Sequence, residues 1–294
     1  MSSTMDDFVQ HIIDSGEYAE TTIFYYKTHC KFILDKVERL GIDPEPATLT
    51  EEDVMQVAQS LRCYAVSTQK DYLVPLKQMC EFAGNRVFDR CKIIFASDVR
   101  PNVDWLTFDQ CKQLLSTYMN PQEEMIVVLE LLHGLRRCEV VRLKISDLHE
   151  DYMTITGKGR MGGKLRSVPY HDDFHKSLSK WLKVRNDMKW KCKNPLDQPD
   201  NLMVYLKGGE LRVYDQIKGA GITKILKELS HRCGIEFSNH TLRRTFGREM
   251  FRSGVPIEVI ATIYGHTSTS VTMKYLGLNM DDMVGAMKKM KLRF

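Results

Sequence analysis

The run at residues 125–132, MIVVLELL, constrains the fold most, because Glu130 is its only polar residue. A helix that is apolar on nearly every side must be enclosed by other elements. Pro121 is well placed to begin this helix, and the run leads directly into the sequence HGLR at 133–136. We therefore expect Arg136 to leave a rigid, buried element at the centre of a domain.

Residues 239–276 carry side chains that suit chemistry at a phosphodiester. His240 and Arg243 are three residues apart, so one helix would place both on the same face. His266 follows a glycine that would end the next helix, and Tyr275 lies nine residues further on. Arginine matches two phosphate oxygens, histidine moves protons near neutral pH, and a tyrosine phenol can act as a nucleophile. Each residue alone is more often structural, so the set is informative only with a second arginine and a lysine.

The second arginine is Arg136. Glu139 lies three residues after it and could hold its guanidinium in place. Arg137 is the alternative for the same role.

A lysine is predicted on a β-hairpin. Short strands are expected at 143–148, 152–156 and 164–170, and the turn GKGRMGG between the last two carries Lys158. Lys164, at the end of the same turn, is the alternative. A surface hairpin without chemistry is the structural alternative.

Taken in order, the G-L-R box, the lysine of a hairpin loop, H-x-x-R, G-H and the tyrosine resemble the tyrosine recombinases of the phage-integrase and Xer type. The resemblance covers about residues 105–280. It implies six catalytic residues and favours Lys158 over Lys164, because Lys158 occupies the G-K-G position. The stretch between G-K-G and V-P is longer here than in typical Xer-like members, so Lys164 stays open as the general acid. The implied catalytic set is Arg136, Lys158, His240, Arg243, His266 and Tyr275.

That resemblance implies site-specific cleavage and rejoining of double-stranded DNA through a 3′-phosphotyrosine and a Holliday junction. Four protomers would act on two duplexes, with no cofactor and no metal. The alternatives are an enzyme like a type IB topoisomerase, which relaxes supercoils as a monomer, and a non-catalytic, sequence-specific DNA-binding regulator. A regulator would have no use for Tyr275.

The charge distribution agrees with a DNA partner. Residues 1–100 carry 11 Lys and Arg against 16 Asp and Glu, a net charge of −5, whereas the remaining residues carry 31 against 22, a net charge of +9. The basic excess therefore lies in the segment that holds the proposed chemistry, and phosphate neutralisation drives much of protein–DNA affinity.

The expected fold is mainly α-helical with a small antiparallel β-sheet. Residues 1–98 are expected to form a helical bundle, the SAM-like core-binding domain that clamps DNA in the family, with long helices at about 20–40 and 67–82 and a helix start at Thr50. A basic linker is expected at 86–104. By resemblance, the lysines that would meet DNA phosphates in this domain are Lys27, Lys31, Lys70 and Lys77.

Residues 99–294 are expected to form the α+β catalytic domain, with a C-terminal interaction helix in the tail. Further helices are predicted at 108–119, 173–190 and 214–231, and Gly254 and Pro256 predict a helix end and a new start. The helix at 214–231 presents a basic face that could lie in a major groove. Its candidate DNA contacts are Lys218 and Lys224.

Composition bounds the remaining possibilities. The eight cysteines are scattered singly, which favours reduced thiols over disulfides or a zinc site. His171 and His175 could share a helix face, but the resemblance requires no metal, and none is predicted. No apolar run is long enough to span a membrane, and no secretory signal is apparent. We therefore expect a cytoplasmic protein, associated with the nucleoid or encoded by a virus in its host cell.

Overall fold

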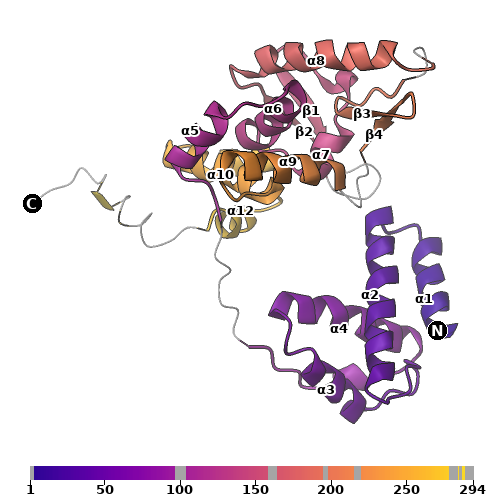
Figure 1. The fold of residues 1–294 in the computed structure, drawn as a ribbon. Helices are drawn as coiled ribbons and strands as arrows, with labels where there is room; N and C mark the ends of the chain where they lie inside the picture. The colour runs from indigo at the N-terminus through magenta and orange to yellow at the C-terminus, as the bar shows by residue number, and fades with distance from the viewer. Residues whose placement is uncertain are drawn as a thin grey trace, which may run out of the picture. The chain divides into compact units, whose positions relative to one another are not determined.

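The computed structural model describes residues 3–96, 104–157, 164–194, 198–214 and 220–277, together with Val284, Met287 and Lys288 (Figure 1). Contacts between residues divide the chain into two compact units, Met1–Pro101 and Asn102–Phe294. This division falls inside the predicted linker at 86–104, three residues after the predicted domain boundary.

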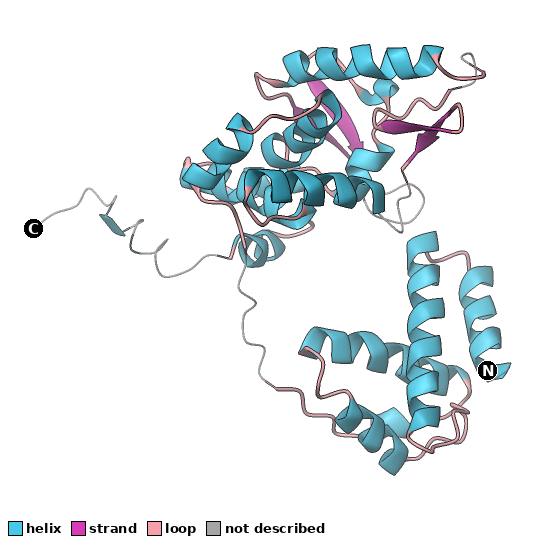
Figure 2. Cartoon of the chain, in the orientation of Figure 1, coloured by secondary structure: helices cyan, strands magenta, loops and turns pink. Residues whose placement is uncertain are grey.

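The first unit is a helical bundle (Figure 2). Cys30, Ile33 and Val37 of the second helix and Leu76 of the fourth are fully buried. Their spacing along each helix produces one apolar stripe that faces the core. The elements are α1 (Ser3–Asp14), α2 (Glu20–Arg39), α3 (Glu51–Ser60), α4 (Val66–Phe82) and the 3₁₀ helix η1 (Val87–Asp89).

The N-terminal part of the predicted linker belongs to this bundle, so the predicted linker was too long. Val87 is fully buried, and the side-chain amide of Asn85 donates hydrogen bonds to the carbonyls of Pro46 and Leu49, both at 2.9 Å. These contacts hold residues 85–89 against the loop that precedes α3.

The second unit is built around the buried apolar run, as the sequence predicted. α6 (Pro121–Val127) is capped by Asn120, whose side chain accepts from the backbone N–H of Glu123, and it continues as a π-helical turn, η2 (Val128–Leu132). The elements around it are α5 (Phe108–Ser116), α7 (Arg137–Arg142), the 3₁₀ helix η3 (Ile145–Asp147), α8 (Phe174–Trp190), α9 (Ala220–Cys233), α10 (Asn239–Arg252), α11 (Ile257–Tyr264) and α12 (Thr269–Leu276).

Two antiparallel hairpins complete the second unit. β1 (Tyr152–Thr156) pairs with β2 (Leu165–Pro169), so that Thr156 lies opposite Leu165 and the predicted lysine loop connects them. β3 (Val204–Lys207) pairs with β4 (Glu210–Val213) through Gly208 and Gly209, and this hairpin was not predicted.

The predicted strand at 143–148 is wrong. Only Lys144 and Leu148 form isolated bridges there, and residues between them form η3. The carboxylate of Asp147 accepts from the backbone N–H of Lys144 at 2.9 Å. This contact closes a tight turn where an extended strand was expected.

Some helix limits also differ from the predictions. α5 ends at Ser116, and Thr117 is already extended. α9 begins at Ala220, whereas Tyr214 lies outside any helix. Lys218, Lys158 and nearly all of the predicted C-terminal helix lie outside the described residues. Among the described residues, none of the helices combines the length and apolar character that a membrane span requires.

Candidate active site

The last three helices carry most of the predicted site. Ser238 caps α10 by accepting from the backbone N–H of Thr241, so His240 and Arg243 lie in the first turns of this helix. α11 ends at Tyr264 and is followed by Gly265, whose φ of 65° is in the left-handed region that favours glycine. These helix ends confirm the prediction from the glycine and proline positions.

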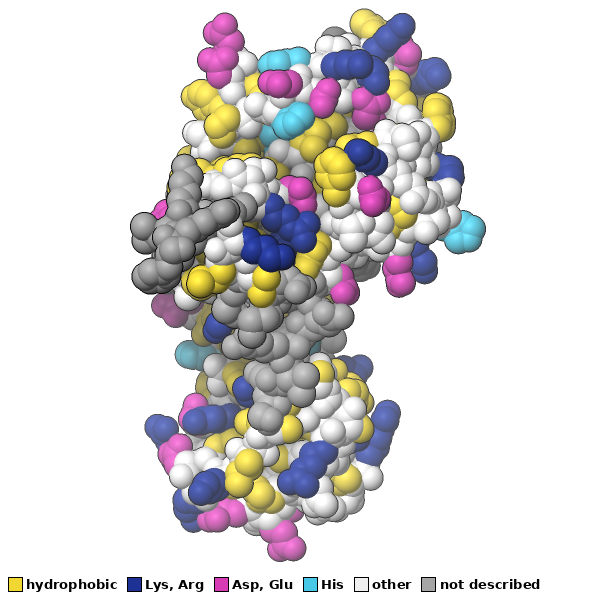
Figure 3. All heavy atoms as spheres, turned by 90° about the vertical axis from the view of Figure 1, so that its left-hand side faces the viewer, with side chains coloured by type: hydrophobic (Ala, Val, Ile, Leu, Met, Phe, Trp, Pro, Cys, Tyr) yellow, Lys and Arg dark blue, Asp and Glu magenta, His cyan; other side chains and the backbone are white. Residues whose placement is uncertain are grey.

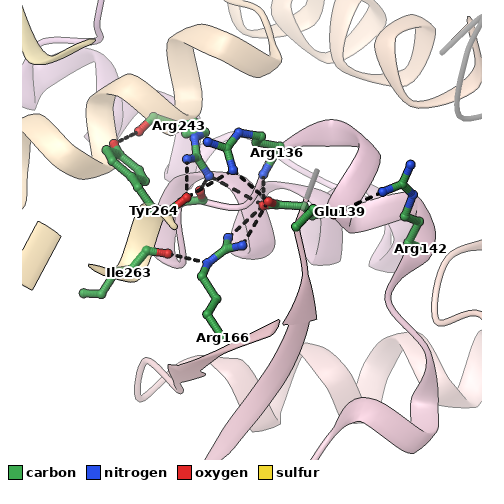
Figure 4. Close-up of polar contacts among 9 residues, drawn as sticks. Arg136, Glu139, Arg142, Arg166, Arg243, Ile263 and Tyr264 are labelled. Carbon is green, nitrogen blue, oxygen red and sulfur yellow. Dashed lines mark hydrogen bonds and ion pairs between the residues drawn. The ribbon is translucent and has the colours of Figure 1, made fainter. Parts of the chain in front are cut away.

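A single buried carboxylate, Glu139 on α7, gathers three arginines (Figure 4). Arg136 Nη1 lies 2.9 Å from Oε1, and Arg243 Nη1 lies 3.6 Å from Oε2. Arg166 of β2 binds both carboxylate oxygens, at 3.0 and 2.8 Å. Burial alone would raise the pKa of Glu139, but hydrogen bonding and charge from Arg166 and the charge of Arg243 outweigh it and lower the pKa.

The two predicted catalytic arginines converge on one backbone oxygen. Arg136 Nη1 and Arg243 Nη2 donate to the carbonyl of Tyr264 at 3.1 and 3.0 Å, and Arg243 also donates to the carbonyl of Gly134. Arg243 is 1% exposed. Burial, and then the charge of Arg136, lower its pKa to about 10, so it stays charged at neutral pH.

Tyr275 of α12 lies beside Arg243 and Arg244. The guanidinium carbon of Arg243 is 5.7 Å from the centre of the Tyr275 ring, and that of Arg244 is 5.3 Å away. The Tyr275 hydroxyl oxygen is buried, and no group in the described part of the chain meets it at full hydrogen-bond geometry, although Arg243 lies close enough to lower the pKa of the phenol. Burial raises the pKa of this phenol, while Arg243 and Arg244 oppose the shift.

His266 is held against α12 by a residue that the sequence reasoning missed. Its Nδ1 lies 2.9 Å from the hydroxyl of buried Thr272, and its ring centre lies 5.7 Å from that of Tyr275. Burial lowers the pKa of His266 to about 4, with further contributions from Arg243 and Arg136. The imidazole is therefore neutral at physiological pH.

The remaining catalytic candidates are exposed or lie outside the described residues. His240 is exposed in the first turn of α10. Lys158 lies outside the described residues, whereas Lys164 is exposed and its carbonyl accepts from the backbone N–H of Gly157 at 3.0 Å. The roles of Lys158 and Lys164 therefore stay predictions. Arg137, the alternative to Arg136, donates instead to the hydroxyl of Thr223 at 3.3 Å.

Predicted DNA contacts outside the catalytic cluster also stay predictions. Lys27 and Lys31 are exposed on α2, and Lys70 Nζ lies 5.1 Å from the centre of the Phe95 ring. Lys77 pairs with Glu81 at 3.6 Å and Lys224 pairs with Glu228 at 3.8 Å. Figure 3 shows Lys and Arg side chains scattered over both units on the face that it presents, with acidic side chains among them.

The histidine pair considered for a metal does not share a helix face. His171 precedes α8, where its Nδ1 lies 3.5 Å from Asp173 Oδ2, while His175 lies inside the helix. Within the described residues, no group of three or more His, Cys, Asp or Glu side chains is placed to hold a metal ion.

Comparison with known proteins shows which family the chain belongs to. The model of the phage integrase family matches residues 104–281, which is more than half of the chain. The tyrosine recombinase XerA of Pyrococcus furiosus is 24% identical over 296 residues, covering 99% of this chain and 95% of that protein. The tyrosine recombinase XerD of Oceanobacillus iheyensis is 32% identical over 180 residues, covering 58% of this chain and 57% of that protein.

Solved structures show the same fold. The crystal structure of XerA recombinase matches 99% of both chains with a TM-score of 0.54 and 22% identity. The Tn1549 transposon integrase in complex with a circular intermediate DNA matches 99% of this chain and 100% of that one, with a TM-score of 0.67 and 17% identity. The chain therefore belongs to the phage integrase family and is a tyrosine-type site-specific recombinase.

Proposed function

We propose that Tyr275 is the nucleophile that cleaves double-stranded DNA at a specific recombination site. The observation that carries this proposal is the convergence of Arg136 and Arg243 on one carbonyl oxygen, at 3.1 and 3.0 Å, next to the Tyr275 ring. Two guanidinium groups that share one acceptor can also share the non-bridging oxygens of a phosphate.

The reaction exchanges one phosphoester for another. The phenolic oxygen of Tyr275 forms a bond to phosphorus while the bond from phosphorus to the 5′ oxygen breaks, which leaves a 3′-phosphotyrosine and a free 5′-hydroxyl. The phenol proton passes to His240, and Lys158, or Lys164 in its place, protonates the departing 5′ oxygen. The 5′-hydroxyl of a partner strand then reverses the step. Because the ester conserves the bond energy, the reaction requires neither a nucleotide nor a metal.

The electrostatics of the cluster support these roles. Three arginines surround one carboxylate, so the cluster keeps an excess of positive charge for a phosphate. The raised pKa of Tyr275 keeps the phenol protonated at neutral pH, and the reaction therefore needs a proton acceptor. His266 is neutral, and in the tautomer whose Nδ1 accepts from the Thr272 hydroxyl, the Nε2–H is free to donate to a phosphate oxygen.

Recombination by this route needs four protomers on two duplexes and proceeds through a Holliday junction. The N-terminal unit would clamp the duplex with the exposed lysines of α2 and α4, and α9 would approach it with Lys224. We place the protein in the cytoplasm, associated with the nucleoid or encoded by a virus in its host cell.

Trapping the covalent intermediate tests the proposal. Purified protein is incubated with fragmented genomic DNA from its source organism and is then denatured. The DNA that stays covalently attached to the protein is sequenced. We expect one enriched sequence with the wild-type chain and none with Tyr275→Phe. Adducts without sequence preference, together with relaxation of any supercoiled plasmid, would indicate a topoisomerase. Absence of adducts from both proteins, with equal sequence-specific binding, would indicate a regulator.

A further inference from the structure

Arg166 of β2 is the most completely bound side chain of the arginine cluster, and it is not one of the six predicted catalytic residues. Its Nε donates to the carbonyl of Ile263 at 2.6 Å, and its Nη1 and Nη2 donate to Glu139 at 3.0 and 2.8 Å. The side chain is only 9% exposed. One guanidinium thus joins the β1–β2 hairpin, α7 and the end of α11 (Figure 4).

The charge balance shows what this contact achieves. Glu139 is completely buried, and a buried carboxylate requires a cation close by. Arg136 and Arg243 are within ion-pair distance of the same carboxylate, at 2.9 and 3.6 Å. Without Arg166, these two arginines would have to neutralise Glu139 themselves. With Arg166 bound to both carboxylate oxygens, their charge stays available to a substrate.

Arg166 also packs against the backbone turn between α11 and α12. A Cβ atom at Gly265 would lie 3.1 Å from Cδ and 3.3 Å from Nη1 of Arg166, so the arginine lies directly against this glycine. Gly265 separates Tyr264, whose carbonyl receives both catalytic arginines, from His266. Arg166 therefore supports the backbone turn that places both the Tyr264 carbonyl and His266 in the site.

We propose that Arg166 is a positioning residue for DNA cleavage. It neutralises Glu139 and anchors the turn at Gly265, so that Arg136 and Arg243 can bind the scissile phosphate. The inference rests on the proposed function, because it assigns Arg166 a part in the same cleavage step.

Single-turnover cleavage of the mapped site at saturating protein measures this role. Arg166→Gln should slow cleavage by about 100-fold, as expected when reacting groups are misplaced by about 1 Å, while DNA affinity changes little. Arg166→Lys keeps the charge but loses the two-pronged contact, so its rate should be intermediate. The matched control is Arg212→Gln, which breaks an exposed ion pair with Glu210 on β4 and should cleave like the wild type.

Two further measurements separate a positioning role from loss of structure. In a Glu139→Gln background there is no carboxylate to neutralise, so Arg166→Gln should slow cleavage much less than it does alone. A methylphosphonate at the scissile position removes one negative charge from the substrate. On this substrate, the defect of Arg166→Gln should shrink if the lost quantity is charge available to the phosphate.

The proposal is overturned if folded Arg166→Gln cleaves at the wild-type rate, or if its defect is the same on both substrates and in both backgrounds. If Arg166→Gln does not fold, Arg166→Lys and the double variant with Glu139→Gln decide by the same criteria. Failure of the wild-type chain to form any Tyr275-dependent adduct is a different result. It would reject the proposed function itself, and the role of Arg166 with it.

Discussion

Two buried glutamates near the site have opposite protonation states because their partners differ. Glu139 is surrounded by arginines, which lower its pKa. Glu130, on the π-helical turn, accepts one hydrogen bond from the side chain of Asn239 at 2.7 Å, and its other oxygen has no partner within the described residues. Burial raises the pKa of Glu130 to about 8. Glu130 is therefore mostly neutral at pH 7. It contacts the first residue of α10, the helix that carries His240.

The protonation of Glu130 predicts a pH-dependent stability. Its pKa rises from 4.5 to about 8 on folding, so its stabilising contribution is complete below pH 4.5 and is lost as the pH rises through 8. Glu130→Gln keeps the acceptor for Asn239 but cannot ionise. The free energy of unfolding of this variant, relative to the wild type, should therefore increase between pH 4.5 and 8, by at most about 1.4 kcal/mol per pH unit.

Urea unfolding at a series of pH values measures this difference. Glu124→Gln is the matched control. Burial alone would raise the pKa of Glu124, but hydrogen bonds from Lys180 and Ser177 outweigh it and lower the pKa, so its difference should be flat above pH 5. A difference for Glu130→Gln that stays constant or decreases over the same range would show that Glu130 is ionised in the fold.

The neutral state of His266 predicts how cleavage responds to its loss. Because the pKa of His266 is about 4, its protonation does not change between pH 5.5 and 8. His266→Gln should slow cleavage by a constant factor over this range, on the order of 100-fold as for removal of one hydrogen-bond donor to a developing anion. A factor that grows several-fold towards low pH would show that His266 titrates in the functional range.

At the scale of elements, helix ends were predictable where the chain itself marks them. Gly254, Pro256 and Gly265 set the limits of α10 and α11, because their backbone preferences act locally. Arg166 was not predictable, since its partner Glu139 is 27 residues away and only the folded chain brings them together. The β3–β4 hairpin did carry a signal, the Gly-Gly pair at 208–209, which a search for short hairpins would have found.

Close packing of α10 against its neighbours predicts the effect of one methyl group. A Cβ atom at Gly247 would lie 2.2 Å from the Tyr264 hydroxyl and 2.8 Å from Leu276 Cδ2. Alanine normally stabilises a helix by about 1 kcal/mol relative to glycine. Here Gly247→Ala should lower the free energy of unfolding by about 1–3 kcal/mol, because it overpacks the contact between α10, α11 and α12. Thermal or urea unfolding measures whether the substitution raises or lowers the free energy of unfolding. A stabilised variant would contradict the close approach of Gly247 to Tyr264 and Leu276.

At the scale of the whole molecule, each unit has its own apolar core. The core of the first unit contains residues from Met5 to Val87, whereas the main core of the second contains residues from Leu106 to Leu242. The sequence was enough to predict the mainly helical fold and the recombinase family, because apolar periodicity and the recombinase motifs are both read along the chain. It could not predict the contacts that organise the site, which join segments from α7 to α12.

The separate cores predict that the second unit folds alone. A fragment of residues 102–294 should unfold in one cooperative transition, because its core uses no residue of the first unit. If the lysines of α2 and α4 contact phosphates as proposed, the fragment should also bind the recombination site more weakly and with a smaller dependence on salt than the full chain. A fragment with the full affinity and salt dependence would exclude those lysines as DNA contacts.

The central claim is that the phenolic oxygen of Tyr275 becomes esterified to the 3′ phosphate of DNA. Mass spectrometry of the trapped adduct after protease and nuclease digestion tests it most directly. The predicted result is a nucleotide attached to the peptide that contains Tyr275, together with a cleaved strand that carries a free 5′-hydroxyl. A nucleotide on a different residue, or a link through a 5′ phosphate, would contradict the account.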